Sequence, residues 1–125
     1  MKQAIQAPNA PQAIGAYSQA IKHGNTVYLS GQIPLHPETM ALVSDDFEKQ
    51  VRQVFTNLQA VCEAAGGSLD AIVKVSIFLS DLAQFPVVNS VMTQFFNQPY
   101  PARSTIQISA LPKAAQIEVE AIMAV

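Results

Sequence analysis

Two apolar stripes with helical spacing, separated by one strand-like segment, constrain the fold of this chain more than any other feature. Apolar side chains recur every three or four residues from Phe47 to Cys62, and again from Phe85 to Phe96. Between the stripes, residues 70–81 carry Val, Ile or Leu at every second position, which is the period of a β-strand. Each predicted helix has one apolar face to bury, so we expect both helices to pack on a sheet.

The ends of these helices carry their own signals. Asp45 and Glu48 have the spacing of a capping box, which predicts that Asp45 is the residue that caps the first helix. The Gly66–Gly67 pair can supply the left-handed residue that ends it. Pro86 suits the first turn of the second helix, because that position needs no backbone N–H donor.

Four more segments have strand character, and they complete the predicted order β-β-α-β-α-β-β. They are residues 17–24, 25–32, 102–109 and 116–125. This order predicts an α+β fold in a single domain, 1–125, with two helices on one face of the sheet. The other face is then left to water or to other subunits. A short loop joins the last two strands, so we expect them to pair antiparallel.

Arg103 is the only charged residue in the long run 82–112. If the last two strands pair antiparallel, side-chain alternation places Arg103 and Thr105 on the face that carries Glu118 and Glu120. Two registers are possible, with either Arg103 or Thr105 opposite Glu120. The arrangement fits an exposed ion pair of small energetic value, or a site in which the guanidinium binds a small carboxylate.

Composition excludes several classes of function. The net charge is −2, the pI is about 5.5 and the basic residues do not cluster, which argues against nucleic-acid binding. No apolar run has membrane-spanning length, and the N-terminal residues lack signal-peptide character, so we expect a cytoplasmic protein. No His/Cys pattern indicates a metal site, and Cys62 is expected to be buried. Only 13% of residues are charged, which favours a homo-oligomer.

Several motifs occur together in an order and spacing that resemble the RidA (YjgF) family of reactive-intermediate imine and enamine deaminases. They are "NAPQAIGAYSQA", "VYLSGQIP", "FLSDLAQFPVVNSV", "YPARS" and "LPKAAQIEVEAI". The resemblance covers essentially the whole chain. It implies a chorismate-mutase-like fold, with a mixed sheet and two helices on one face. It also implies a homotrimer with sites in clefts between neighbouring subunits.

The same resemblance implies a reaction. Dehydratases that use pyridoxal phosphate release enamines, which tautomerise to 2-imino acids such as 2-iminobutyrate and 2-iminopropionate. RidA-type enzymes hydrolyse these imines to 2-keto acids and ammonia without a metal or cofactor of their own. The alternative is a non-catalytic module that binds a small metabolite in the same cleft. Some relatives are called ribonucleases or translation inhibitors, and the acidic balance of this chain argues against that activity.

The resemblance also assigns roles to individual residues. Arg103 matches the arginine that binds the substrate carboxylate, and Glu118 matches the glutamate that orients or activates water. Thr105 stands where many members have a cysteine whose backbone carbonyl holds water. The implied substrate-binding residues are Tyr17, Ser30, Gly31, Asn89 and Arg103. Residue alternation cannot separate Glu118 from Glu120. The motif favours Glu118, and Glu120 is interpreted as a structural or intersubunit ion-pair partner.

Three positions depart from the family pattern. Thr105 excludes thiol chemistry at its position. Ala16 stands where proline is common, which loosens the loop before Tyr17. The segment before Tyr100 is shorter than in many members, which predicts a reshaped cleft mouth and an altered substrate range.

Overall fold

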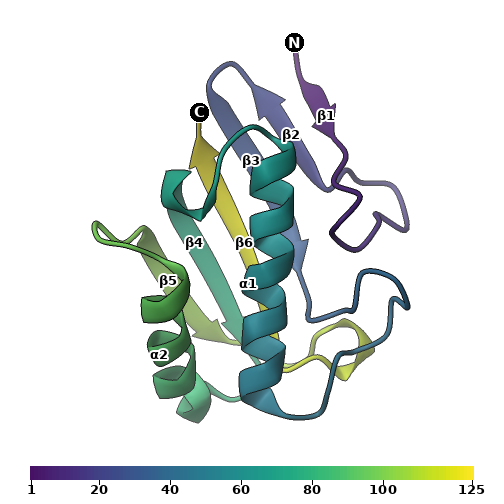
Figure 1. The fold of residues 1–125 in the computed structure, drawn as a ribbon. Helices are drawn as coiled ribbons and strands as arrows, with labels where there is room; N and C mark the ends of the chain where they lie inside the picture. The colour runs from purple at the N-terminus through teal and green to yellow at the C-terminus, as the bar shows by residue number, and fades with distance from the viewer.

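Six strands form one mixed sheet, and the two long helices lie on the same face of it (Figure 1). The computed structural model describes all of residues 1–125. The strand order is β1-β2-β3-β6-β4-β5, and only β4 and β5 pair in parallel. The strands are β1 (Gln3–Ile5), β2 (Ala20–His23), β3 (Thr26–Gln32), β4 (Ile72–Leu79), β5 (Ala102–Gln107) and β6 (Ile117–Ala124), and the helices are α1 (Phe47–Ala64) and α2 (Phe85–Phe95). The predicted α+β arrangement is confirmed.

The core lies between the helices and the centre of the sheet. Phe55 of α1 packs against the rings of Phe95 and Phe96, with ring centroids 5.7 and 5.4 Å apart. Cys62 is buried as predicted, and its burial raises the pKa of its thiol to about 12. No helix has the length and apolar character needed to cross a bilayer. The other core side chains without solvent exposure include Val51, Val54, Leu58, Val61, Val75, Ile77, Leu79, Ile117, Val119 and Met123.

The predicted antiparallel pairing of the last two strands is wrong. β5 pairs in parallel with β4, and β6 pairs antiparallel with both β3 and β4. The reason is the helix between β4 and β5, because a strand–helix–strand crossover returns the chain so that the second strand runs parallel to the first. β6 pairs with the other edge of β4. Because its second edge pairs with β3, β6 has hydrogen-bond partners on both sides.

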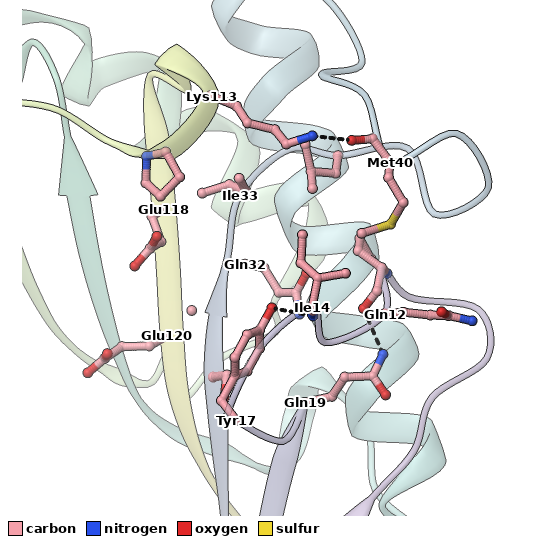
Figure 2. Close-up of a pocket in the computed structure, with 15 residues that line it drawn as sticks. Gln12, Ile14, Tyr17, Gln19, Gln32, Ile33, Met40, Lys113, Glu118 and Glu120 are labelled. Carbon is pink, nitrogen blue, oxygen red and sulfur yellow. Dashed lines mark hydrogen bonds between the residues drawn. The ribbon is translucent and has the colours of Figure 1, made fainter.

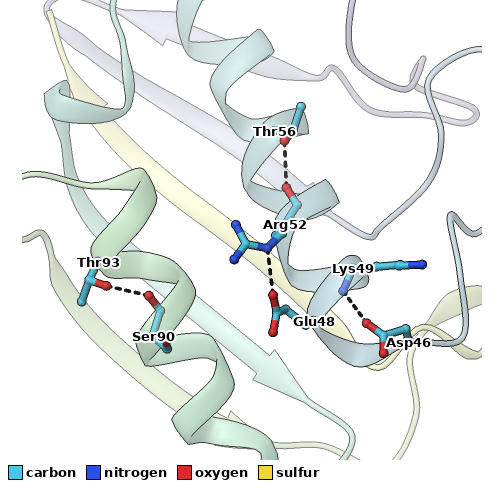
Figure 3. A network of polar contacts seen from close by, with 7 residues as sticks. All are labelled: Asp46, Glu48, Lys49, Arg52, Thr56, Ser90 and Thr93. Atoms are coloured by element: carbon cyan, nitrogen blue, oxygen red, sulfur yellow. Dashed lines mark hydrogen bonds and ion pairs between the residues drawn. The ribbon is translucent and has the colours of Figure 1, made fainter.

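The helix ends match the sequence signals except at the start of α1, where both residues of the expected capping box have other roles. Asp46, not Asp45, caps α1, and its carboxylate accepts a hydrogen bond from the Lys49 N–H at 3.0 Å (Figure 3). Glu48 does not complete a capping box; it pairs with Arg52 at 3.1 Å. The left-handed Gly66 and the first-turn Pro86 are confirmed, with Gly66 at φ +90°. The edge strand β1 was not predicted, because three residues are too few to show a period.

Replacing Asp46 with alanine is expected to lower the free energy of unfolding by about 1 kcal/mol, because the Lys49 N–H loses its acceptor. Urea denaturation should show a lower midpoint with an unchanged slope. Asp45→Ala is the matched control and should leave the midpoint nearly unchanged. A larger effect at Asp45 than at Asp46 would contradict the observed cap.

Candidate active site

The residues singled out from the sequence separate into two groups on opposite faces of the sheet. In β4, Val75 lies beside Arg103 of β5. Val75 is fully buried beneath the helices, so Arg103 points to the helix face. The next β4 residue, Ser76, lies beside Glu120 of β6 and points the other way, as does Phe78 beside Glu118. The prediction that Arg103 and Thr105 share a face with the two glutamates is therefore wrong.

This error has a single physical cause. Side-chain alternation says which residues within a strand share a face, but only the pairing partner says which face that is. With β5 paired to β4, the odd-numbered β5 residues lie on the helix side. Ile106, which the assumed hairpin would have buried beneath the helices, is instead 50% exposed.

Arg103 is held by neutral groups from α2. Its Nη1 donates a hydrogen bond to Asn89 Oδ1 at 3.0 Å and contacts Met92 Sδ at 3.5 Å. Its guanidinium carbon lies 4.7 Å from the centroid of the Phe85 ring, a cation–π distance. The one salt bridge of the chain is elsewhere, between Arg52 and Glu48. The ion-pair interpretation of Arg103 is excluded within one chain, and its charge has no anionic partner there.

Thr105 lies two residues after Arg103 on the same side of β5. Its hydroxyl oxygen is buried and has no hydrogen-bond partner within the chain. Buried polar groups are nearly always paired, so an unpaired hydroxyl is unusual. Arg103, Asn89 and Thr105 together form what we call the arginine group.

A cleft of about 580 Å³ opens on the other side of the sheet (Figure 2). Five of its lining residues, which we call the glutamate group, come from the N-terminal loop, β3 and β6: Tyr17, Ser30, Gly31, Glu118 and Glu120. Ser30 Oγ donates to the Ser18 carbonyl at 2.6 Å, and Tyr17 Oη accepts from the Ile14 N–H at 3.3 Å. These bonds attach the N-terminal loop to the strand and orient its aromatic ring.

Gly31 allows the carboxyl group of Glu118 to lie against β3. A Cβ atom at position 31 would lie 2.6 Å from Glu118 Oε2, closer than any normal contact. A bulge interrupts the pairing of β3 with β6 between Leu29 and Gln32, at the same place. A side chain at position 31 would therefore displace the Glu118 carboxyl group, although the backbone angle of Gly31 does not itself call for glycine.

Glu118 has a raised pKa because it is partly buried and, second, because the charge of Glu120 lies nearby. Both carboxylates line the same cleft, and no basic group forms a salt bridge with either. A carboxylate whose pKa is raised toward neutral can exchange protons with bound water more readily. The structure holds no group of three or more His, Cys, Asp or Glu side chains placed to bind a metal ion.

Replacing Glu120 with glutamine is expected to lower the pKa of Glu118, because the repulsive charge is removed while the burial remains. Carboxyl ¹³C NMR titration should record a lower midpoint for Glu118. Because the folded pKa lies above the unfolded one, the contribution of Glu118 to stability is full below the unfolded pKa and is lost as pH rises through the folded pKa. Glu63→Gln on α1 is the control, and an equal shift there would contradict the assignment.

The cleft also contains residues that the sequence did not indicate. Gln19 is buried, and its side chain bonds to Ala7 and Pro11, which anchors the loop that precedes Tyr17. Lys113 and Met40 meet across the rim. No local pattern signals such contacts, because the partners are far apart in the chain.

Comparison with known proteins finds one family model and several related proteins that match nearly the whole chain. The family model described as Endoribonuclease L-PSP matches residues 7–125. A protein of Dermatophagoides farinae named 2-iminobutanoate/2-iminopropanoate deaminase is 47% identical, over 99% of this chain and 97% of its own. The crystal structure of RidA from an Antarctic Psychrobacter has 50% identity and a TM-score of 0.95, covering 98% and 99% of the two chains. The structure of E. coli TdcF with bound serine has 39% identity and a TM-score of 0.93, covering 98% of each chain.

Proposed function

The chain belongs to the Endoribonuclease L-PSP (YjgF/RidA) family, and from this premise we propose that it hydrolyses reactive 2-imino acids to 2-keto acids and ammonia. The observation that carries the proposal is the unpaired charge of Arg103, which Asn89 and Phe85 hold in place without neutralising it. Such a guanidinium can bind a carboxylate through two hydrogen bonds. The name of the Dermatophagoides farinae relative, 2-iminobutanoate/2-iminopropanoate deaminase, supports the same substrate class.

The opposite placement of the two groups supports a site between subunits. A 2-imino acid carries its carboxylate and its C=N bond on adjacent carbons, so it cannot contact Arg103 and Glu118 across one sheet. The arginine group of one chain and the glutamate group of a neighbour can meet only if chains associate. The sheet face away from the helices exposes large apolar side chains, including Tyr28 at 52% and Ile106 at 50%. We propose a cytoplasmic homotrimer in which this face contributes to the contacts.

The residue types suit the chemistry. Arg103 binds the carboxylate, which orients the C=N carbon toward a water held by Glu118 and the Thr105 carbonyl. The water oxygen bonds to that carbon, Glu118 accepts the water proton, and the C=N π electrons move to nitrogen. Glu118 then returns the proton to nitrogen. Glu118 then carries the hydroxyl proton of the carbinolamine to its nitrogen, so that the C=O bond forms, the C–N bond breaks, and ammonia and the 2-keto acid are released.

Tyr17, Ser30 and Gly31 would form the substrate pocket beside Glu118, and Asn89 would position Arg103. The direct test adds the purified protein to a threonine dehydratase reaction and follows the appearance of 2-ketobutyrate. We expect faster keto-acid formation than with the dehydratase alone. An unchanged rate at saturating protein would remove the proposal.

The bound serine in the TdcF structure favours one alternative, a module that binds a small metabolite without converting it. Calorimetry with 2-ketobutyrate separates the two functions. Tight binding without any acceleration of imine hydrolysis would support the module. The family description also contains the word endoribonuclease, but the net charge of −2 and the scattered basic residues argue against RNA binding.

A further inference from the structure

Two loops form the rim of the cleft, and the side chain of Lys113 joins them. Its Nζ donates a hydrogen bond to the Met40 carbonyl at 2.9 Å, although the two residues are 73 positions apart. Both residues line the same cleft as Glu118. In Figure 2 this bond lies on the far side of Ile33 from the carboxylates of Glu118 and Glu120. The Lys113 side chain therefore bridges the cleft away from the reacting groups.

The backbone of both loops is strained at this bridge. The chain has three non-glycine residues with positive φ, and they are Met40 at 61°, Lys113 at 57° and Ala114 at 56°. L-residues adopt this conformation only where surrounding contacts compensate its cost, and such residues concentrate at ligand-binding sites. Both strained segments meet at the Lys113–Met40 hydrogen bond.

Side chains from elsewhere hold the ends of the Met40 loop, while its tip is shaped from within, where the Met40 N–H donates to the His36 carbonyl at 2.8 Å. The Asn57 side chain donates to the Leu35 carbonyl at 3.0 Å before the tip. The Gln116 side chain donates to the Asp45 carbonyl at 2.9 Å after it. Between these points, Gln50 Nε2 donates to the Ser44 carbonyl at 2.8 Å, and Lys113 donates to Met40 at the tip, so the loss of Lys113 removes this link to the tip without detaching the ends.

Apolar side chains make up part of the cleft lining, and in Figure 2 Ile33 lies between the bridge and the carboxylates of the two glutamates. Ile14, Ile33, Leu35 and Met40 are among the lining residues. The cleft volume of about 580 Å³ is far larger than a four-carbon imino acid requires, and it falls in the range of pockets that enclose larger ligands. An apolar substrate side chain that extends from the reacting carbon has these apolar residues available to contact.

We propose that Lys113 is a specificity-determining residue, whose bridge to Met40 closes the cleft beyond Ile33 and limits the length of the substrate side chain. The inference rests on the proposed imine hydrolysis for its substrate class. It goes beyond that function because it concerns which imino acids are accepted.

The test compares two substrates on the full-length protein. One is 2-iminobutyrate from threonine dehydratase, and the other is the longer, branched imino acid that an L-amino-acid oxidase forms from leucine. Lys113→Met removes the donor and keeps the apolar stem. It is expected to raise the kcat/KM ratio of the long over the short substrate about tenfold, mainly through KM. Lys113→Arg retains a donor and should keep the wild-type ratio.

Two further variants secure the result. Lys113→Gly removes the bridge and relieves the left-handed strain, so it should fold well and shift the ratio in the same direction. Lys49→Met, an exposed lysine at the start of α1, should leave the ratio unchanged. An unchanged ratio in both Lys113→Met and Lys113→Gly would overturn the proposal.

A wild type that hydrolyses neither imine would refute the proposed function but not the role of Lys113. Calorimetry with the two corresponding 2-keto acids then decides. Removal of the bridge should improve the relative affinity for the longer keto acid. Equal relative affinities in wild type and variants would overturn the inference about Lys113.

Discussion

Replacing Arg103 with alanine is expected to lower kcat/KM for 2-imino acid hydrolysis by about a thousandfold, because the substrate loses both its anchor and its orientation. Within the chain, Arg103 has only neutral partners, so its charge is free to bind a substrate carboxylate and forms no structural ion pair there. Arg103→Lys should recover only part of the loss, because an ammonium group cannot grip a carboxylate with a planar fork. Steady-state rates in the coupled dehydratase assay measure both effects.

The control for this prediction is the other arginine of the chain. Arg52 lies on α1 and pairs with Glu48 at the surface, so Arg52→Ala should leave kcat/KM unchanged. Thermal unfolding should show that Arg103→Ala still folds and loses little stability, since the residue is exposed and its hydrogen bond to Asn89 lies at the surface. An Arg103→Ala protein that accelerates keto-acid formation as well as wild type would remove the carboxylate-binding role.

The parts of the fold that could be predicted are those with local causes. The apolar stripe of α1 needs only a 3.6-residue period, and the left-handed Gly66 needs only the absence of a Cβ atom. The observed cap lies one residue after the predicted one. Ser44 Oγ accepts a hydrogen bond from the Asp46 N–H, which favours Asp46 over Asp45 at this position. Adjacent polar residues compete for such a position, and periodicity does not choose between them.

Strand pairing failed because its causes are not local. The loop between β5 and β6 is short, which favours pairing of these two strands. In the structure β6 instead lies between β3 and β4, where it has hydrogen-bond partners on both edges. Because β5 therefore pairs with β4 and not with β6, Arg103 lies on the helix face. Glu118 and Glu120 stayed together, because residues two apart in one strand share a face whatever its partner. The same logic explains why contacts such as Lys113 with Met40 could not be predicted.

Mixing two inactive variants is expected to restore activity. Arg103→Ala and Glu118→Gln each remove one group of the proposed site, and these groups lie on opposite faces of one chain. In a cyclic trimer with one arginine group and one glutamate group per interface, any hybrid of the two variants contains one interface with both groups intact. Hybrids should therefore have about a third of the wild-type activity per trimer, while each parent variant is nearly inactive.

Co-expression with two different affinity tags and purification over both isolates the hybrids, whose imine hydrolysis is then measured. As a control, each variant is co-expressed with itself under the two different tags, and these trimers should stay nearly inactive. The double variant Arg103→Ala/Glu118→Gln is also mixed with wild type. An intact site then needs two neighbouring wild-type chains, so the activity of these hybrids should fall below their fraction of wild-type chains. A site contained within one subunit predicts no recovery in any hybrid, since no single chain then has both groups. Recovery thus requires that Arg103 and Glu118 come from different chains, as their placement on opposite faces of the sheet demands.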